Sequence, residues 1–328
     1  MEERVLLGEI TCPSGELVLM DGGYLDLWSG DRSPDDTAEP GTVAAADFEI
    51  AGLHAAAAAR SFARQSGLYL YDIPQHGVAK IHASFAEHCR ERNFQAQLRL
   101  FPRRVPHRDR FRRAIKGGDP DFLITGVPVV PVGKVPSDRP LPVIAIRGAN
   151  SWREIQVLFG GGAPVKTRQL GSIFVDHARF VFADVDALGQ WVHEETLDGL
   201  ADLVFWGRDE EQVAAEFHAK RTGTPGDDNF GWLNLPDEKA YQQAVRLQHR
   251  QHAEPEVKFA FDFRPHSHHW QVMAGVRASA HDAAAVTVGN AEVMMAMTSV
   301  GDGVFPVQLD LDAAGKPAAI RIAVGNGD

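Results

Sequence analysis

The stretch from Val257 to Trp270 constrains the fold most strongly, because it joins a clear strand pattern to a helix pattern. Apolar and polar residues alternate over 257–264, which is typical of a strand with one buried face. Pro265 lacks a backbone N–H and ends the hydrogen-bond ladder of this strand. Helical spacing begins at Trp270. The chain therefore changes from strand to helix at 265–270, and a histidine-rich segment lies at the junction.

The histidines and an aspartate at this junction predict a site for a divalent metal. If the backbone stays extended, His266 and His268 point the same way; if a helix starts at once, His266 and His269 pair instead. Two imidazoles with a carboxylate suit Zn²⁺ or Fe²⁺. We therefore expect His266, His268 and His269 to be ligands. Asp262 is then either a further ligand or the acceptor that fixes a histidine tautomer.

Two other interpretations of the junction stay open. Arg264 offers a planar guanidinium, and the N–H groups at the start of the helix could bind an anion. Alternatively, the histidines only bond to backbone and water around the helix start. If the site is catalytic, Asp262, Arg264 and His266 are the residues that we expect to act.

A second polar cluster follows the strand that ends at Val175. Asp176 and His177 lie at a tight turn, and Asp184 and Asp186 follow the next strand. If this cluster faces the histidines, Asp176 becomes a further metal ligand. If it does not, these aspartates are turn and cap residues, as is usual for aspartate at such positions.

The segment 99–116 is strongly basic, although the chain as a whole is acidic. Arg103, Arg104 and Arg108 could bind a phosphate-containing ligand, and the same charge could receive an RNA strand or an acidic partner. The alternative is that the arginines pair with acidic residues of the protein itself.

Composition narrows the class of protein. The formal net charge of −11 argues against binding to duplex DNA. No apolar run is long enough to span a membrane, and the first residues resemble no leader peptide, so we expect a soluble cytoplasmic protein. Only Cys12 and Cys89 are present, which excludes a disulfide framework.

The remaining pattern predicts an α+β protein. Strands at 5–11 and 16–20 are expected to form a hairpin, and a closing hairpin is expected at 304–322. Helices are expected at 48–65 and 77–93. We therefore predict a main domain of mixed or antiparallel β-structure, with a helical and basic insertion near 48–116. As domain boundaries, we expect residues 1–47 and 122–328 to form the β-rich domain and residues 48–121 to form the insertion.

Three separated stretches carry short motifs: GEITCPSGELVLMD, VDHARFVFAD and GDGVFPVQLDLDAAGKPAAIRI. The motif residues are Pro13, Ser14, Gly15, Asp21, Val175, Asp176, Phe182, Asp184, Gly301, Asp302, Gly303, Phe305 and Pro306. In these motifs the chain resembles a bacterial family of β-rich proteins whose function is unknown. The resemblance implies a β-rich scaffold and supplies no catalytic residue. The segment 48–120 and the histidine stretch lie outside the family pattern.

Three functions remain as hypotheses. The first is a metal-assisted enzyme, hydrolytic or oxygen-dependent, in which a metal-bound water is the nucleophile. The second is a non-catalytic interaction protein of the immunity or regulatory type, whose acidic exterior contacts a basic partner. The third is a protein that binds a phosphate-containing ligand through the basic segment and Arg264, with salt-sensitive affinity.

Overall fold

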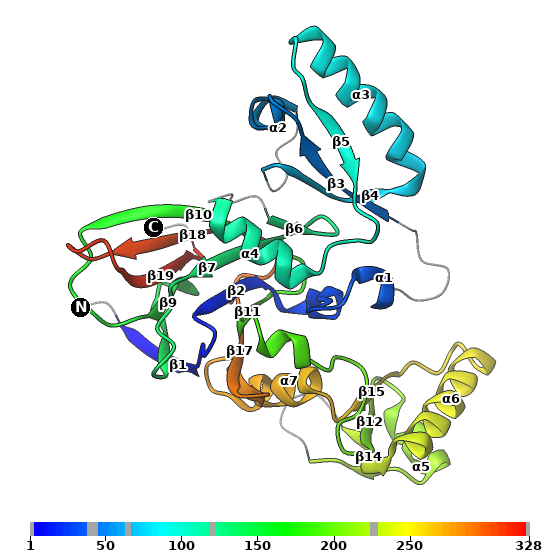
Figure 1. The fold of residues 1–328 in the computed structure, drawn as a ribbon. Helices are drawn as coiled ribbons and strands as arrows, with labels where there is room; N and C mark the ends of the chain where they lie inside the picture. Colours follow the sequence, from blue (N-terminus) through cyan, green and yellow to red (C-terminus); the bar gives the residue numbers. More distant parts are fainter. Residues whose placement is uncertain (1–2, 38–44, 63–66, 118–121, 224–228, 326–328) are drawn as a thin grey trace. The chain divides into compact units, whose positions relative to one another are not determined.

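The structure is a computed structural model that describes residues 3–37, 45–62, 67–117, 122–223 and 229–325. The chain forms two compact units, the first of residues 1–190 and 287–328 and the second of residues 191–286. Figure 1 shows their strands and helices. The predicted insertion at 48–121 lies in the first unit, but 63–66 and 118–121 fall outside the described residues, so its boundaries stay a prediction.

Two six-stranded sheets, named sheet A and sheet B, belong to the first unit, apart from residues 283–286 at the start of one strand of sheet B. Their described pairings are antiparallel. In spatial order, sheet A consists of β1 (Arg4–Ile10), β8 (Leu141–Arg147), β9 (Trp152–Leu158), β19 (Pro317–Ala323), β18 (Gly303–Leu311) and β10 (Lys166–Val175). Sheet B consists of β16 (Ala283–Val288), β17 (Ala291–Met297), β11 (Arg179–Asp184), β2 (Glu16–Asp21), β7 (Val127–Gly133) and β6 (Phe122–Ile124). The sheets pack against each other, and Phe180 meets Phe305 edge to face with ring centroids 5.0 Å apart.

The closing hairpin of β18 and β19 shows how local sequence produces two strands of sheet A. Phe305, Val307 and Leu309 alternate with more polar residues and are buried. The turn is held by Asp312, whose carboxylate accepts hydrogen bonds from the backbone N–H groups of Ala314 at 2.8 Å and Lys316 at 2.9 Å. This hairpin and the predicted α+β class are confirmed. The hairpin predicted at 5–20 is wrong, because β1 and β2 belong to different sheets.

Residues 45–117, here called the first module, add a small three-stranded sheet with helices to the first unit. Its elements are β3 (Ala45–Ala51), α2 (Ala55–Phe62), β4 (Tyr69–Pro74), η2 (Gln75–Gly77), α3 (Val78–Glu91), β5 (Gln97–Leu100) and α4 (His107–Gly117). The sheet has the order β4-β3-β5. Short helices η1 (Gly22–Leu27), α1 (Pro34–Thr37) and η3 (Ala187–Gln190) complete the unit.

The helical insertion predicted near 48–116 is therefore corrected. Residues expected to begin a helix at 48 instead belong to β3, and α2 starts only at Ala55. Phe48 and Ile50 are buried in alternation with the partly exposed Glu49, which is a strand pattern. The second predicted helix is confirmed as α3.

The second unit contains an analogous module at residues 200–278, here called the second module. Its elements are β12 (Leu200–Trp206), α5 (Glu210–Phe217), β13 (Lys220–Arg221), β14 (Phe230–Pro236), α6 (Asp237–Ala253), β15 (Ala260–Pro265) and α7 (His268–Ala278). The sheet order is β13-β14-β12-β15. Among the described residues of either unit, no helix is long and apolar enough to cross a membrane.

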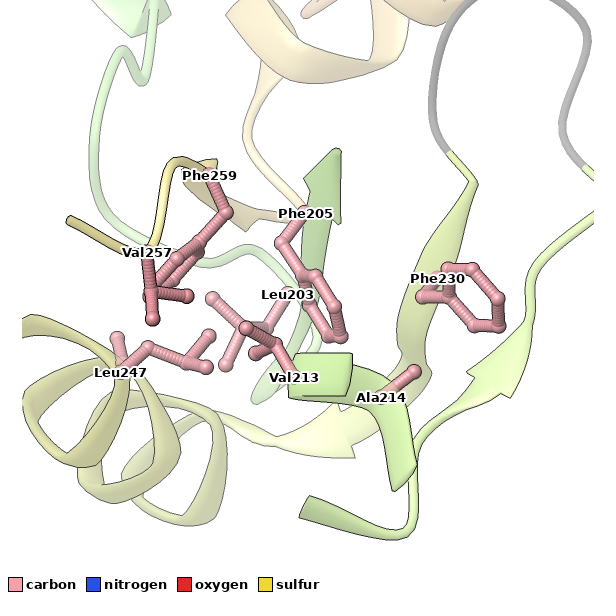
Figure 2. Packing of buried hydrophobic residues seen from close by; sticks show 9 residues of the cluster. Leu203, Phe205, Val213, Ala214, Phe230, Leu247, Val257 and Phe259 are labelled. Carbon is pink, nitrogen blue, oxygen red and sulfur yellow. The ribbon is translucent and has the colours of Figure 1, made fainter. Parts of the chain in front are cut away.

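The core of the second module lies between its sheet and helices α5 and α6. Figure 2 shows Leu203 and Phe205 of β12 with Val213 of α5 and Leu247 of α6. All four side chains are fully buried. Each contributes about 1.5–3 kcal/mol of stability relative to an exposed position.

The two sheets of the first unit arise from two copies of one strand pattern. β1, β2 and β6–β9 recur in the same order as β10, β11 and β16–β19. The segment from Gly8 to Asp21 aligns without a gap with the segment from Gly171 to Asp184. Gly8 and Gly171 each follow a register shift, with φ of 154° and 153°. This internal duplication was not predicted from the sequence.

The pairing registers relate the two copies by an approximate two-fold axis. In sheet B the central strands are β2 and β11, and Leu19 pairs with its own counterpart, Phe182. In sheet A the central strands are β9 and β19, and Gln156 pairs with its counterpart, Arg321. The axis therefore passes through the middle of both sheets.

Two buried aspartates, one from each copy, hold the turn of the other copy. Asp21 ends β2 and accepts hydrogen bonds from the backbone N–H groups of Asp176 at 2.7 Å and His177 at 3.1 Å, just before β11. Asp184 ends β11 and accepts from the backbone N–H of Ser14 at 2.8 Å, just before β2. Both aspartates are fully buried. We call this pair the reciprocal aspartates.

The two modules are also copies of each other. In the first module Asp47 accepts a hydrogen bond from the backbone N–H of Asp72 at 2.9 Å. In the second module Asp202 accepts from the backbone N–H of Asn234 at 2.7 Å. Asp72 and Asn234 share the left-handed backbone conformation, with φ of 54° and 55°. The same uncommon backbone conformation at equivalent positions supports the conclusion that the two modules are copies.

Candidate functional site

The predicted junction of strand and helix is confirmed in the second module. β15 ends at Pro265, and α7 begins at His268 after the N-cap residue Ser267, whose side chain accepts a hydrogen bond from the N–H of Trp270. Five of the predicted site residues lie on or beside this junction: Asp262, Arg264, His266, His268 and His269.

His266 lies between two carboxylates. Its Nδ1 is 2.9 Å from Asp198 and its Nε2 is 3.3 Å from Asp202. Burial lowers the pKa of His266, but the hydrogen bonds to Asp198 and Asp202 outweigh burial and raise it above its ordinary value. The pair of acceptors suits an imidazolium, in which both nitrogens donate and neither can bind a metal.

His268 and His269 contact different neighbours. Nδ1 of His268 accepts a hydrogen bond from the backbone N–H of Val192 at 3.0 Å, and its ring stacks on Trp191. Burial lowers the pKa of His268, so the neutral ring carries its proton on Nε2 and has no second lone pair for a metal. His269 is buried and stacks on His193 with ring centroids 4.1 Å apart.

The other predicted site residues form local pairs. Arg264 donates to Asp262 at 2.8 Å and lies over the ring of Trp270. Asp176 belongs to the first unit and accepts a hydrogen bond from the hydroxyl of Tyr24 at 3.0 Å. Within the described ranges, no group of three or more His, Cys, Asp or Glu is arranged to hold a metal ion. The Zn²⁺ or Fe²⁺ site stays a prediction, and these contacts do not support it.

Protonated His266 will stabilise the second unit in a pH-dependent way. Because its folded-state pKa is raised, this stabilisation is fully present below about pH 6.5, the pKa of an unfolded histidine, and is lost as pH rises through the folded-state pKa. Thermal unfolding of wild type and His266→Gln between about pH 5 and 8 measures the effect. The difference in Tm should shrink as pH rises, and a pH-independent difference would contradict the prediction.

The arginines predicted to bind phosphate are instead paired with acidic residues of the first unit. Arg103 pairs with Asp36. Arg104 donates to Asp35 at 2.6 Å, and Arg108 contacts Asp31 at 2.6 Å. This is the alternative in which the protein neutralises its own basic segment. A phosphate ligand would have to displace these carboxylates, so the contacts do not support that hypothesis.

One arginine of the basic segment, Arg110, is fully buried and holds the first module together. Its guanidinium lies 2.9 Å from Asp47 and 2.7 Å from Asp72, and stacks over the ring of Tyr71. Burial raises the pKa of Asp47 despite the nearby Arg110. At Asp72 burial is outweighed by the hydrogen bonds from Arg110, and the pKa is lowered. These residues are structural.

A cavity of about 680 Å³ lies on the outer face of sheet A, at the approximate two-fold axis. Six charged residues from both copies line it: Arg4, Arg153, Glu154, Lys166, Asp310 and Arg321. Four basic groups against two carboxylates give the lining an excess positive charge. This volume suits a small metabolite.

Arg321 is the centre of a fixed polar network on the floor of this cavity. Its Nε lies 2.7 Å from Asp310, and its Nη1 lies 3.3 Å from Glu154. Nη2 lies 3.2 Å from the hydroxyl of Thr167, which donates to Asp310 at 2.7 Å. Burial opposes ionisation of Asp310, but the hydrogen bonds from Arg321 and Thr167 outweigh it and lower its pKa. Asp310 is therefore ionised at neutral pH.

The loop after β9 borders the cavity and brings backbone close to it. Gly160 and Gly161 line the cavity and have φ of 74° and 102°, a conformation that favours glycine. Gly162 lines it as well. The glycine run lacks the lysine and the helix that a phosphate loop requires. Its actual role at the cavity was not predicted.

Comparisons with known proteins assign no family to the chain. A scan against family models, a search of curated proteins and a search of solved structures each find no match. The resemblance to a bacterial β-rich family therefore stays a prediction. The motif residues behind it include the reciprocal aspartates, Asp21 and Asp184, which hold turns.

Proposed function

We propose that this protein binds a polyhydroxylated small molecule that carries a carboxylate or phosphate group, in the cavity on sheet A. The observation that carries the proposal is the fixed Arg321–Asp310 network on the floor of a metabolite-sized cavity with a positive lining. A network that is already ordered loses little side-chain entropy when a ligand binds. This supports a binding site over an incidental surface depression.

The two parts of the site suit different groups of such a ligand. On the floor, Asp310 and Glu154 outnumber the single positive charge of Arg321 and can accept hydrogen bonds from hydroxyl groups. On the rim, Lys166 and Arg153 supply the excess positive charge. On a chain with a net charge of −11, such a local excess attracts anions. The ligand should therefore be both hydroxylated and anionic.

Isothermal titration calorimetry with four probes tests the proposal: gluconate, glucose 6-phosphate, inorganic phosphate and the uncharged polyol glucitol. We expect gluconate or glucose 6-phosphate to bind most tightly. Of the four probes, only these two carry both hydroxyl groups for the floor and a negative charge for the rim. Binding of neither hydroxylated anion would overturn the proposal. Equal binding of glucitol would overturn the role of the rim charge.

A double variant, Arg153→Gln with Lys166→Gln, should weaken binding of the best anion by about tenfold or more, because two rim charges are lost. The matched control is Lys80→Gln with Arg90→Gln, which removes two exposed charges from α3. The control should bind like wild type. An unchanged affinity of the rim variant would contradict the site.

The functions predicted from the sequence stay hypotheses beside this one. Elemental analysis of untagged protein, with a His268→Ala/His269→Ala variant, tests the metal-assisted enzyme. Stoichiometric Zn or Fe that is lost in the variant would favour that function, which the hydrogen bonds of His266 and His268 do not support.

A further inference from the structure

Two adjoining cavities lie along strand β10, away from the cavity on the outer face of sheet A. Their volumes are about 520 Å³ and 410 Å³, and both are lined by Gln169 and Leu170 of β10. Apolar groups from sheet B, including Phe122, Pro128 and Pro131, line their opposite sides. Together they form a groove, here called the β10 groove.

β10 is an edge strand of sheet A. In the described part of the sheet, β18 is its one neighbour. The pairing runs along the whole strand, from Lys166 opposite Leu311 to Val175 opposite Gly303. An edge strand presents backbone N–H and C=O groups to any extended chain that lies beside it. The β10 groove therefore combines an apolar floor with a template for strand addition.

The equivalent edge in the first copy, β1, is closed. The backbone N–H of Thr11 donates to the carbonyl of Glu292 at 3.3 Å, and the N–H of Glu292 donates to the Thr11 hydroxyl at 2.8 Å. The side chain of Met294 packs so tightly on Gly8 that a Cβ there would lie 2.7 Å from its methyl group. These contacts join β1 to β17.

At the corresponding positions of the second copy, the hydrogen bond to the Thr11 hydroxyl and the packing of Met294 have no equivalent. Glu292 corresponds to Pro128, which has no N–H to donate. Met294 corresponds to the shorter Val130. The groove beside β10 therefore results from specific differences between two otherwise equivalent edges, and not from the fold itself.

The charges of the groove indicate the kind of partner. Lys134 and Arg168 are the charged residues in its lining, and both are exposed. Pairing of β10 with a second copy of β10 would place Lys166 and Arg168 against like charges, which disfavours self-association. We propose that an extended, acidic segment of a partner protein adds to β10 as a further strand.

Fluorescence anisotropy with a labelled peptide of alternating valine and glutamate tests this proposal on the full-length protein. We expect saturable binding that weakens at high salt, because Lys134 and Arg168 contribute through charge. The same peptide with alternate N-methylated amides, which cannot complete a strand ladder, should bind at least about tenfold more weakly. Equal binding of the N-methylated peptide would overturn strand addition.

Charge reversal supplies the second test. Lys134→Glu with Arg168→Glu should abolish binding of the glutamate peptide and create binding of a valine–lysine peptide. The matched control, Arg60→Glu with Arg90→Glu, reverses two exposed charges on α2 and α3 and should bind like wild type. Binding unaffected by reversal at the groove, or a dimer of the protein that the peptide dissociates, would overturn the proposal.

Discussion

Replacing Arg110 with methionine should lower the free energy of unfolding of the first unit by about 3–5 kcal/mol. Asp47 and Asp72 would remain buried without the guanidinium that now lies 2.9 Å and 2.7 Å from them. The substitution keeps most of the side-chain volume, so the loss reports on charge more than on packing. Urea unfolding followed by a probe in the first unit measures it.

The pH dependence of this variant has a definite sign. Without Arg110, the pKa values of Asp47 and Asp72 will rise above those in the wild type, because burial is then opposed mainly by hydrogen bonds from backbone N–H groups. The folded variant therefore gains stability relative to the wild type as these groups protonate, and its loss of stability should be smaller near about pH 4 than at pH 7.

The control Arg103→Met removes a half-exposed ion pair and should lower the free energy of unfolding by no more than about 1 kcal/mol. Similar losses of unfolding free energy in Arg110→Met and Arg103→Met would contradict the special role of the buried Arg110.

Replacing either reciprocal aspartate with alanine should cost about 3 kcal/mol or more. Asp184 accepts hydrogen bonds from the backbone N–H groups of Ser14, Asp186 and Ala187, and each buried N–H left without an acceptor costs about 1–3 kcal/mol. Asp21 is equally buried, so Asp21→Ala should have an effect of similar size. Chemical unfolding of the two variants under identical conditions tests the equivalence.

The hairpin turn offers the matched control for these variants. Asp312 also accepts hydrogen bonds from two backbone N–H groups, but at an exposed turn where water can replace it. Asp312→Ala should therefore cost no more than about 1 kcal/mol. If Asp21→Ala were as mild as this control while Asp184→Ala were severe, the two turns would not be equivalent.

Much of the fold could be predicted from the sequence because alternation and turn chemistry act locally. The strand before Pro265, the N-cap region of α7 and the closing hairpin follow from residues close in the chain. The error at β3 arose where alanines both precede and follow the strand. The alternating Phe48 and Ile50 carried the correct signal, but the alanine-rich run 55–59 outweighed it.

The candidate site could not be predicted in this way. Arg4, Glu154 and Arg321 come from three strands that are far apart in the chain, and no local spacing relates them. For the basic segment, the sequence left both a bound ligand and pairing within the protein open, because the acidic partners Asp31, Asp35 and Asp36 lie far away in the chain. The duplication, in contrast, was detectable: Gly8 to Asp21 and Gly171 to Asp184 have equal length and share Ile10 with Ile173 and Val18 with Val181.

The reciprocal aspartates have a consequence for the order in which the chain can fold during synthesis. The turn before β2 needs the carboxylate of Asp184 as its hydrogen-bond acceptor, and β9 needs β19 as its second neighbour in sheet A. Both partners are synthesised later than the elements that need them. The first copy therefore leaves the ribosome with an unpaired edge on β2 and on β9, and it stays incomplete until most of the second copy has been made. Such long-range pairing favours slow folding and makes the nascent chain a client for chaperones that shield exposed strands.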